Sequence, residues 1–260
     1  MNIRTVTVTG ADNSTLYSEM LRISQMYPFV EWGILFSLKR QGECRYPSIN
    51  WIKGLIEFID ANPSVKFNLS AHFCGEYTKE MISEASANKI YSNVMSELKT
   101  FGDYFDRVQL NFNASKNTIP ELFYELFYDV IGEKNNNRSS ENAFILQSNE
   151  PNKIVCDRII EMGLSNINFL YDSSGGRGVV NDNWLPPTKN HFTGYAGGLT
   201  PENISEQLIK IESVAGDTEI WLDAESGLRS TREVDGYNYL DMHKVQVFLN
   251  KIAAKRNENL

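Results

Sequence analysis

Eight short runs rich in apolar and β-branched residues recur along the chain, and most are separated by segments with the apolar spacing of an amphipathic helix. Parallel strands need long crossover connections, which helices usually fill, so this alternation predicts a parallel sheet. The expected strands cover residues 3–9, 30–38, 65–71, 107–112, 143–147, 166–171, 191–196 and 218–222. The expected helices cover residues 14–26, 48–59, 78–98, 119–127, 152–162, 201–213 and 240–254.

Eight parallel strands in 260 residues match the size of one (β/α)8 barrel, in which the sheet closes on itself. We therefore predict an α/β fold made of a single TIM barrel domain over residues 1–260. Pro186 and Pro187 lie in a segment without an amphipathic face, so a loop is expected to replace the helix between the sixth and seventh strands. The rival fold is an open, doubly wound sheet. It is disfavoured because Thr9-Gly10-Ala11-Asp12 lacks the G-x-G-x-x-G spacing of a dinucleotide-binding turn.

The charge of the chain and its lack of long apolar runs narrow the class of protein. A formal net charge of -8 disfavours a binder of duplex nucleic acid, which usually presents a basic face, so no nucleic-acid partner is expected. The alternating residues 1–8 do not match a signal peptide, and no run reaches the length of a membrane-spanning helix. We expect a cytoplasmic protein without a membrane partner, either a monomer or a homodimer.

Cysteine and histidine spacing gives no sign of a metal site or a disulfide framework. The cysteines are Cys44, Cys74 and Cys156, and the histidines are His72, His191 and His243. None of them forms a Cys-x-x-Cys pair or a His-Glu-x-x-His cluster. No cofactor motif is visible either, so we expect neither a metal nor a cofactor.

Glycine-rich turns follow the sixth and seventh expected strands, and a Ser-Gly turn follows the eighth. Glycine lets backbone N–H groups approach an anion without a Cβ between them, and a helix N-terminus adds a favourable dipole. After the seventh strand, Thr200 can cap a helix and Pro201 can open it. Each turn alone could be an ordinary connection, but turns that meet at one barrel face predict a phosphate site. The expected ligand is a phosphorylated small molecule held by Gly176, Gly178, Gly197, Gly198, Ser226 and Gly227.

Polar side chains also gather at the carboxyl ends of the expected strands, which share one face of a barrel. They are Thr9, Asp12, Ser37, Lys39, His72, Cys74, Asn111, Asn113, Gln147, Asp172, Tyr195, Asp223 and Glu225. Asp172 is the leading general acid or base, with a loop-capping aspartate as the alternative. His72 is a second candidate, with a hydrogen-bonded structural histidine as the alternative. Arg45 is either a partner for a ligand carboxylate or a solvated charge.

The late turns resemble those of the phosphoribosylanthranilate isomerase family, (β/α)8 barrels that rearrange an aminoaldose phosphate to an aminoketose by general acid and base catalysis. Asp172-Ser173-Ser174-Gly175-Gly176-Arg177-Gly178 is similar to the family's segment with the catalytic aspartate. Ala196-Gly197-Gly198-Leu199-Thr200-Pro201-Glu202-Asn203 is similar to its phosphate-binding signature, and Asp223-Ala224-Glu225-Ser226-Gly227-Leu228 to its last strand and second phosphate turn. The resemblance implies that Asp172 is the general acid.

The N-terminal half resembles the family more loosely, through residues 8–10, 45–48 and 108–111. Thr9 stands where the family has a cysteine that acts as the general base. A threonine hydroxyl is too weakly acidic to replace a thiol unaided. The nearest candidates to take the proton in place of Thr9 are His72, Glu225 and Asp12.

Three functions fit this departure at Thr9. Another residue takes the proton in a related isomerisation, the barrel runs a different reaction on a sugar phosphate, or the protein binds a sugar phosphate or nucleotide without turnover. We predict an isomerase-like enzyme, with a non-catalytic binding or sequestering protein as the alternative. Extra sequence at residues 76–102 and 113–142, beyond the length usual in the family, suggests added surface for a partner or a lid.

Overall fold

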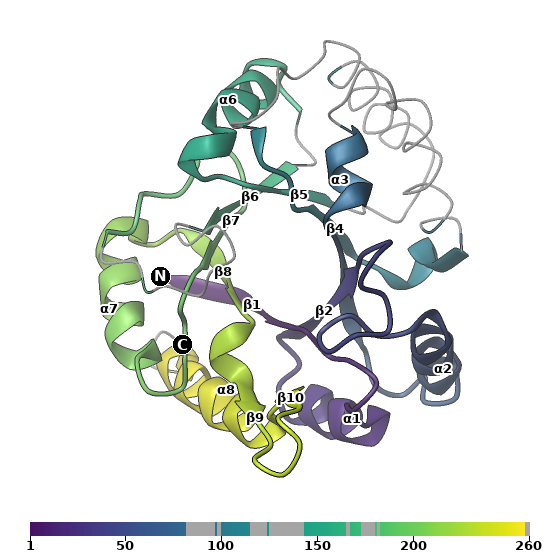
Figure 1. Ribbon diagram of the computed structural model, residues 1–260. Helices are drawn as coiled ribbons and strands as arrows, with labels where there is room; N and C mark the ends of the chain where they lie inside the picture. Colours follow the sequence, from purple (N-terminus) through teal and green to yellow (C-terminus); the bar gives the residue numbers. More distant parts are fainter. Residues whose placement is uncertain are drawn as a thin grey trace.

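Eight strands form a closed parallel barrel in the computed structural model, which describes residues 1–81, 97, 100–114, 124, 143–164, 167–172, 180 and 183–257. Each strand pairs with its neighbour in chain order, and β8 pairs with β1 to close the ring (Figure 1). The strands are β1 (Asn2–Thr9), β2 (Val30–Phe36), β3 (Asn68–Phe73), β4 (Arg107–Leu110), β5 (Ala143–Gln147), β6 (Ile167–Asp172), β7 (Thr193–Ala196) and β8 (Glu219–Ala224). The predicted (β/α)8 barrel is confirmed.

The described helices lie outside the ring of strands (Figure 1). They are α1 (Tyr17–Met26), α2 (Ile49–Asp60), α3 (Glu76–Met81), α6 (Lys153–Glu161), α7 (Ile204–Ala215) and α8 (Met242–Asn257). Shorter elements are the 3-10 turns η1 (Gly102–Tyr104), η3 (Glu150–Asn152) and η4 (Ser226–Leu228), and the hairpin of β9 (Arg229–Thr231) and β10 (Asn238–Leu240). Apart from residue 124, the helix expected at residues 119–127 falls outside the described residues, and so does most of the one expected at 78–98.

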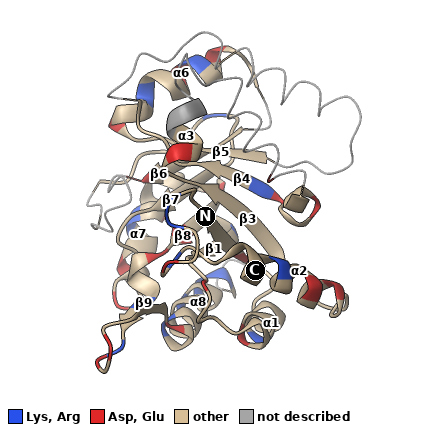
Figure 2. Cartoon of the chain, turned by 45° about the vertical axis from the view of Figure 1, so that its right-hand side comes forward, with Lys and Arg blue, Asp and Glu red and all other residues tan. Residues whose placement is uncertain are grey.

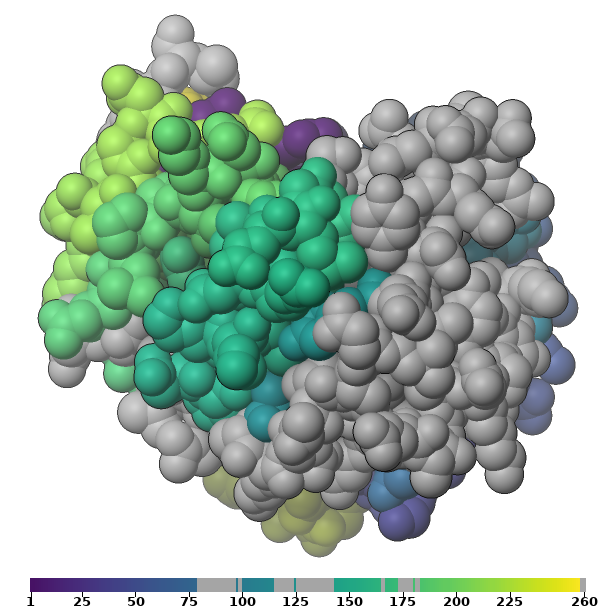
Figure 3. All heavy atoms as spheres, turned by 90° about the horizontal axis from the view of Figure 1, so that it is seen from above, coloured from purple at the N-terminus to yellow at the C-terminus, as the bar shows by residue number. Residues whose placement is uncertain are grey.

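No helix lies between β6 and β7 in the described part of that connection, residues 180 and 183–192. Trp184 from this loop is buried, and its Nε1 donates a hydrogen bond to Oε1 of Gln207 on α7 at 3.0 Å. Its ring also meets Tyr195 of β7 edge to face. Figure 3 shows that on one face of the molecule the teal and green parts of the chain adjoin. The described part of this connection is the loop that the two prolines predicted, and its tryptophan packs against α7 and β7.

Helix α7 begins at Ile204, so the expected start at Pro201 is wrong. The reason is a set of side-chain hydrogen bonds that hold the preceding residues as a turn. Thr200 Oγ1 accepts backbone N–H groups from within this turn, the nearer at 3.2 Å. Asn203 accepts the N–H of Thr200 at 2.9 Å and donates to the carbonyl of Gly198 at 2.8 Å. These bonds brace the glycine turn after β7 against the start of the helix.

Side chains along each strand alternate between the helix-facing core and the barrel interior. On β1, Val6 and Val8 belong to the core under the helices, whereas Thr7 and Thr9 make their contacts inside the barrel. A separate apolar cluster inside the barrel consists of Ile145, Leu170, Ala196 and Trp221, from β5 to β8. The barrel interior therefore has an apolar side on β5 to β8 and a polar side on β1 to β4. This polar side is unusual, because branched apolar residues fill the interior of most TIM barrels.

A buried salt bridge lies in the polar half of the barrel, between Glu31 of β2 and Arg107 of β4. Arg107 donates from Nη2 and Nε to the two carboxylate oxygens at 2.6 and 2.8 Å, and Thr7 donates to Oε1 of Glu31 at 2.8 Å. Burial opposes ionisation of Glu31, but the Arg107 charge and these hydrogen bonds outweigh it and hold the pKa of the carboxyl below its ordinary value. The pair therefore stays ionised beneath the mouth of the barrel.

Charged residues of both signs are interspersed over the outer helices in the view of Figure 2. On α6, for example, Lys153 pairs with Asp157 at 2.7 Å, and both side chains are exposed. Exposed pairs of this kind contribute little to stability, because water screens the two charges. The buried core, rather than the surface ion pairs, therefore accounts for most of the stability.

Candidate functional site

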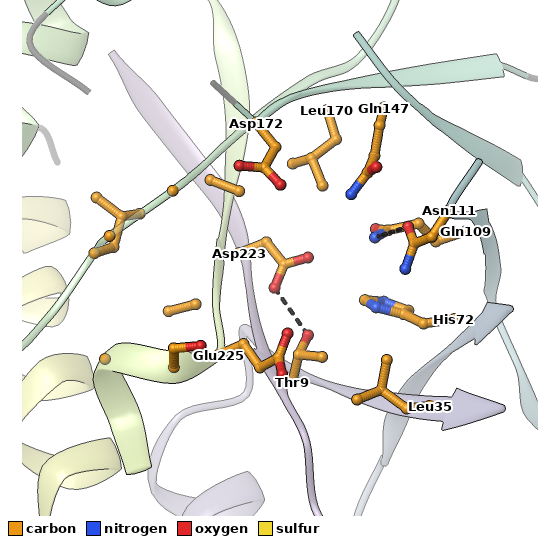
Figure 4. Close-up of a pocket in the computed structure, with 17 residues that line it drawn as sticks. Thr9, Leu35, His72, Gln109, Asn111, Gln147, Leu170, Asp172, Asp223 and Glu225 are labelled. Atoms are coloured by element: carbon orange, nitrogen blue, oxygen red, sulfur yellow. Dashed lines mark hydrogen bonds between the residues drawn. The ribbon is translucent and has the colours of Figure 1, made fainter. Parts of the chain in front are cut away.

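A cavity lies at the carboxyl ends of the strands, which gather at one face because all eight strands run in the same direction (Figure 4). Its empty volume is about 590 Å³, including solvent at its open side. The described residues that line it are Thr9, Leu35, His72, Gln109, Asn111, Gln147, Leu170, Asp172, Ala196, Gly197, Gly198, Leu199, Asp223, Ala224, Glu225, Ser226 and Gly227. Every strand of the barrel contributes at least one of them.

The glycine turns after β7 and β8 meet at the edge of this cavity. Gly197 and Gly198 have positive φ angles of 110° and 64°, which favour glycine. A Cβ on Gly227 would lie 2.1 Å from the carbonyl oxygen of Leu199, so the two backbones can approach this closely only because residue 227 is glycine. The two turns therefore form one continuous backbone surface. Gly176 and Gly178, predicted to join them, lie outside the described residues.

Two buried aspartates face the cavity from β6 and β8. Figure 4 shows the carboxyl groups of Asp172 and Asp223 pointing into the same space. Asp172 is 4% exposed and Asp223 is 7% exposed. Asp172 ends its strand as the sequence predicted, and Asp223 lies on the neighbouring wall because β6 and β8 flank β7. A pair of carboxyl groups around one space is an arrangement suited to general acid and base chemistry.

The carboxyl group of Asp223 is held by Thr9 of β1. Thr9 Oγ1 donates to Oδ1 of Asp223 at 2.8 Å (Figure 4), and in the described part of the chain Asp223 has no ion-pair partner. Burial raises the pKa of Asp223 to about 8, and the nearby Glu225 and Glu31 charges act in the same direction, while the Thr9 hydrogen bond and the more distant Arg107 charge oppose the shift. The carboxyl group therefore exchanges a proton near neutral pH, as a catalytic acid or base must.

Asp223 was expected at the strand ends, but without a catalytic role. Trp221, Asp223 and Glu225 alternate along β8 and its end, so they share the face that looks into the barrel. The sequence signal that could have identified Asp223 as a catalytic candidate was an acidic residue inside a strand, between two buried neighbours. The raised pKa itself depends on burial and on the charges of Glu225 and Glu31, which the pattern of β8 alone does not contain.

His72 of β3 lines the cavity as predicted, but its environment keeps it neutral. Burial lowers the pKa of His72 to about 4, with a smaller contribution of the same sign from Arg107, while Glu31 opposes the shift. The ring Nε2 and Ser70 Oγ are 2.9 Å apart and share a hydrogen bond. His72 therefore offers hydrogen-bonding capacity to the site rather than a proton that titrates near neutral pH.

An amide wall lies across the cavity from the carboxyl groups (Figure 4). Gln109 of β4 donates from Nε2 to Oδ1 of Asn111 at 2.8 Å, and Gln147 of β5 stands beside them. The Oε1 of Gln109 is buried and has no hydrogen-bond partner among the described residues. Asn111 and Gln147 were expected at the strand ends, whereas Gln109 was missed. Its position two residues before Asn111, on the same face of β4, was the signal that could have found it.

Arg45 and Glu225 form an ion pair at the rim. The Nη1 of Arg45 donates to Oε1 of Glu225 at 2.9 Å and to Oγ of Ser226 at 3.2 Å. The backbone N–H of Arg45 donates to Asp12 at 2.8 Å, and Asp12 is also paired with Arg229 at 2.8 Å. Arg45 itself does not line the cavity, and Asp12, a candidate base, is buried behind it. These contacts fasten the loops after β1 and β2 to the turn after β8.

The structure thus brings most of the predicted site residues to one cavity. Those that line it are Thr9, His72, Asp172, Gly197, Gly198, Glu225, Ser226 and Gly227. Among the described residues, no group of three or more His, Cys, Asp or Glu side chains is arranged to hold a metal ion. Within the same described ranges, no helix has the length and apolar character needed to cross a membrane.

No protein-family model matches the chain, and no curated protein matches it in sequence. The resemblance to phosphoribosylanthranilate isomerases therefore remains a prediction from the motifs at Asp172 and the glycine turns, with Thr9 as its departure from that family.

Proposed function

We propose that the protein is an acid/base isomerase of a phosphorylated, ribose-derived small molecule, related in chemistry to phosphoribosylanthranilate isomerase. The observation that carries the proposal is that Asp172 and Asp223 face the same cavity that the two glycine turns border. One end of this cavity suits an anion and the other suits proton transfer. A phosphorylated aminoaldose needs both.

The phosphate is assigned to the surface formed by Gly197, Gly198, Ser226 and Gly227. Turns without side chains expose backbone N–H groups to an anion, and no Cβ blocks close approach. Ser226 adds a hydroxyl donor at the same place. The phosphate anchors the sugar so that its reactive carbons lie against the carboxyl groups, which supplies the orientation on which such catalysis depends.

Proton transfer is divided between the two aspartates. Asp172 protonates the ring oxygen of the aminoaldose, which opens the ring and leaves an iminium group at C1. The ionised form of Asp223 removes the proton from C2, giving an enaminol that becomes the aminoketose when C1 gains a proton and the C2 hydroxyl loses one. The overall change moves hydrogen within the molecule, so no oxidant or cofactor is needed. Thr9 acts here as a hydrogen-bond donor that positions Asp223.

A non-catalytic binding protein is the second candidate, and Thr9 in the place of the family's cysteine favours it. One experiment separates the two. Purified protein is given phosphoribosylanthranilate, whose fluorescence is lost on turnover, and separately ribose 5-phosphate with ammonia in D2O, with deuterium at C1 of the aminoketose followed by NMR. Three results together support the isomerase. Either substrate is turned over, Asp172→Asn and Asp223→Asn abolish this turnover, and the exposed Asp217→Asn retains it.

Two other outcomes would count against the isomerase. Binding of the phosphorylated compounds without turnover would favour the binding protein. Turnover that appears only in a Thr9→Cys variant would show that the wild-type site lacks a working base.

A further inference from the structure

We infer that the cavity takes a sugar phosphate whose non-phosphate end carries a protonated aliphatic amine, and that it discriminates against an anionic group at that end. This inference rests on the proposed function, because it assumes that the phosphate lies at the glycine turns. It departs from the expectation that Arg45 receives a ligand carboxylate. Three features of the described cavity carry it.

The first feature is the charge of the lining. Asp172, Asp223 and Glu225 all line the cavity, and no lysine or arginine is among its described lining residues. Once a phosphate occupies the glycine turns, a further anion on the same ligand would enter a buried space whose described lining offers it no cation, because the nearby Arg45 is already paired with Glu225. A cation at that end is complementary to the carboxyl groups.

The second feature is the amide wall. Gln109 is 3% exposed, it lines the cavity, and its Oε1 is an acceptor without a partner in the described structure. An unpaired buried acceptor is stabilised by a ligand that brings a donor. An ammonium group carries three donors and no acceptor, whereas a carboxylate carries only acceptors. Gln109 therefore favours the amine independently of the acidic residues.

The third feature is the occupied arginine. Glu225 holds Nη1 of Arg45 at 2.9 Å, and Ser226 accepts from the same nitrogen at 3.2 Å. A ligand carboxylate would have to displace Glu225 to reach this guanidinium, and the displaced carboxylate would remain at the cavity. The protein thus supplies its own carboxylate where an anionic substrate group would otherwise pair.

The reaction chemistry agrees with this choice. Opening of an aminoaldose leaves a positively charged iminium at C1, and the product amine is again a cation. Carboxyl groups fixed in a buried cavity stabilise such a charge without reorganising. A cationic ligand also favours the ionised form of Asp223, so its binding is expected to release a proton from that residue.

The test compares three ligands that differ only at C1: 1-amino-1-deoxy-D-ribitol 5-phosphate, D-ribitol 5-phosphate and D-ribonate 5-phosphate. Isothermal titration calorimetry near pH 7.5 is expected to show that the amine binds at least about tenfold more tightly than ribitol phosphate, which is the gain from one charge-assisted hydrogen bond. The ribonate is expected to bind more weakly than ribitol phosphate. Repeating the amine titration in buffers of different ionisation enthalpy is expected to reveal proton release that Asp223→Asn removes.

Variants test the origin of the selectivity. Glu225→Gln frees Arg45 and is expected to raise ribonate affinity by about tenfold, while Gln109→Met reduces the preference for the amine. Glu219→Gln, at the exposed opposite end of β8, is the matched control and leaves both affinities unchanged. Equal binding of the three compounds, or tightest binding of ribonate, overturns the inference and leaves the phosphate site intact. Failure of all three to bind overturns the proposed function itself.

Discussion

Asp223→Asn is expected to make the protein more stable than the wild type at high pH. The pKa of Asp223 in the folded protein is about 8, above its ordinary value of 3.8, because the carboxyl group is buried without a cation. The folded state therefore holds a proton that the unfolded state releases between these values. The stability that this group contributes is complete below about pH 4 and is lost as the pH rises through about 8.

The size of this effect follows from the two pKa values. A pKa difference of one corresponds to about 1.4 kcal/mol, so the interval from 3.8 to about 8 corresponds to on the order of 5 kcal/mol. Asparagine is nearly the same size as aspartic acid, stays neutral, and keeps an oxygen that can accept the Thr9 hydroxyl. The variant should therefore match the wild type near pH 4 and exceed it by several kcal/mol near pH 9.

Urea unfolding measured at intervals from pH 4 to pH 9 tests this expectation. The informative quantity is the difference in unfolding free energy between the variant and the wild type, because other titrating groups largely cancel in it. Asp217→Asn, at an exposed position, is the matched control for the substitution itself. A flat difference for Asp223→Asn over the same range would refute the reasoning about its burial.

Three further predictions concern the site and the barrel interior. Gly227→Ala should lower phosphate-ligand affinity and stability together, because its Cβ would lie 2.1 Å from the carbonyl oxygen of Leu199; unchanged calorimetric affinity would contradict the contact. His72 should stay neutral down to about pH 5 in 15N NMR spectra, and a titration near 6.5 would contradict its burial. Arg107→Met should destabilise the protein by about 3–5 kcal/mol in urea unfolding, because it leaves Glu31 buried without its cation, and a loss below about 1 kcal/mol would contradict that pairing.

Local patterns in the sequence were sufficient to predict the barrel and the position of its functional face. Strand periodicity, helix spacing and the glycines after the last strands are encoded over a few residues, so they can be read without knowing what lies nearby in space. Asp172 and the turns at Gly197 and Ser226 were found in this way. The start of α7 was misplaced because side-chain bonds from Thr200 and Asn203 outweighed the helix-start signal of Pro201.

Contacts between distant segments of the chain decided the protonation and pairing of the site residues. The hydrogen bond between Thr9 and Asp223 joins residues 214 positions apart, and the pair of Arg45 with Glu225 joins residues 180 apart. A pKa depends on burial and on neighbouring charges, and both exist only after the barrel has closed. The sequence by itself thus determined which side chains reach the mouth of the barrel. The tertiary structure decided which carboxyl group holds a proton near neutral pH, because only closure of the barrel removes Asp223 from water.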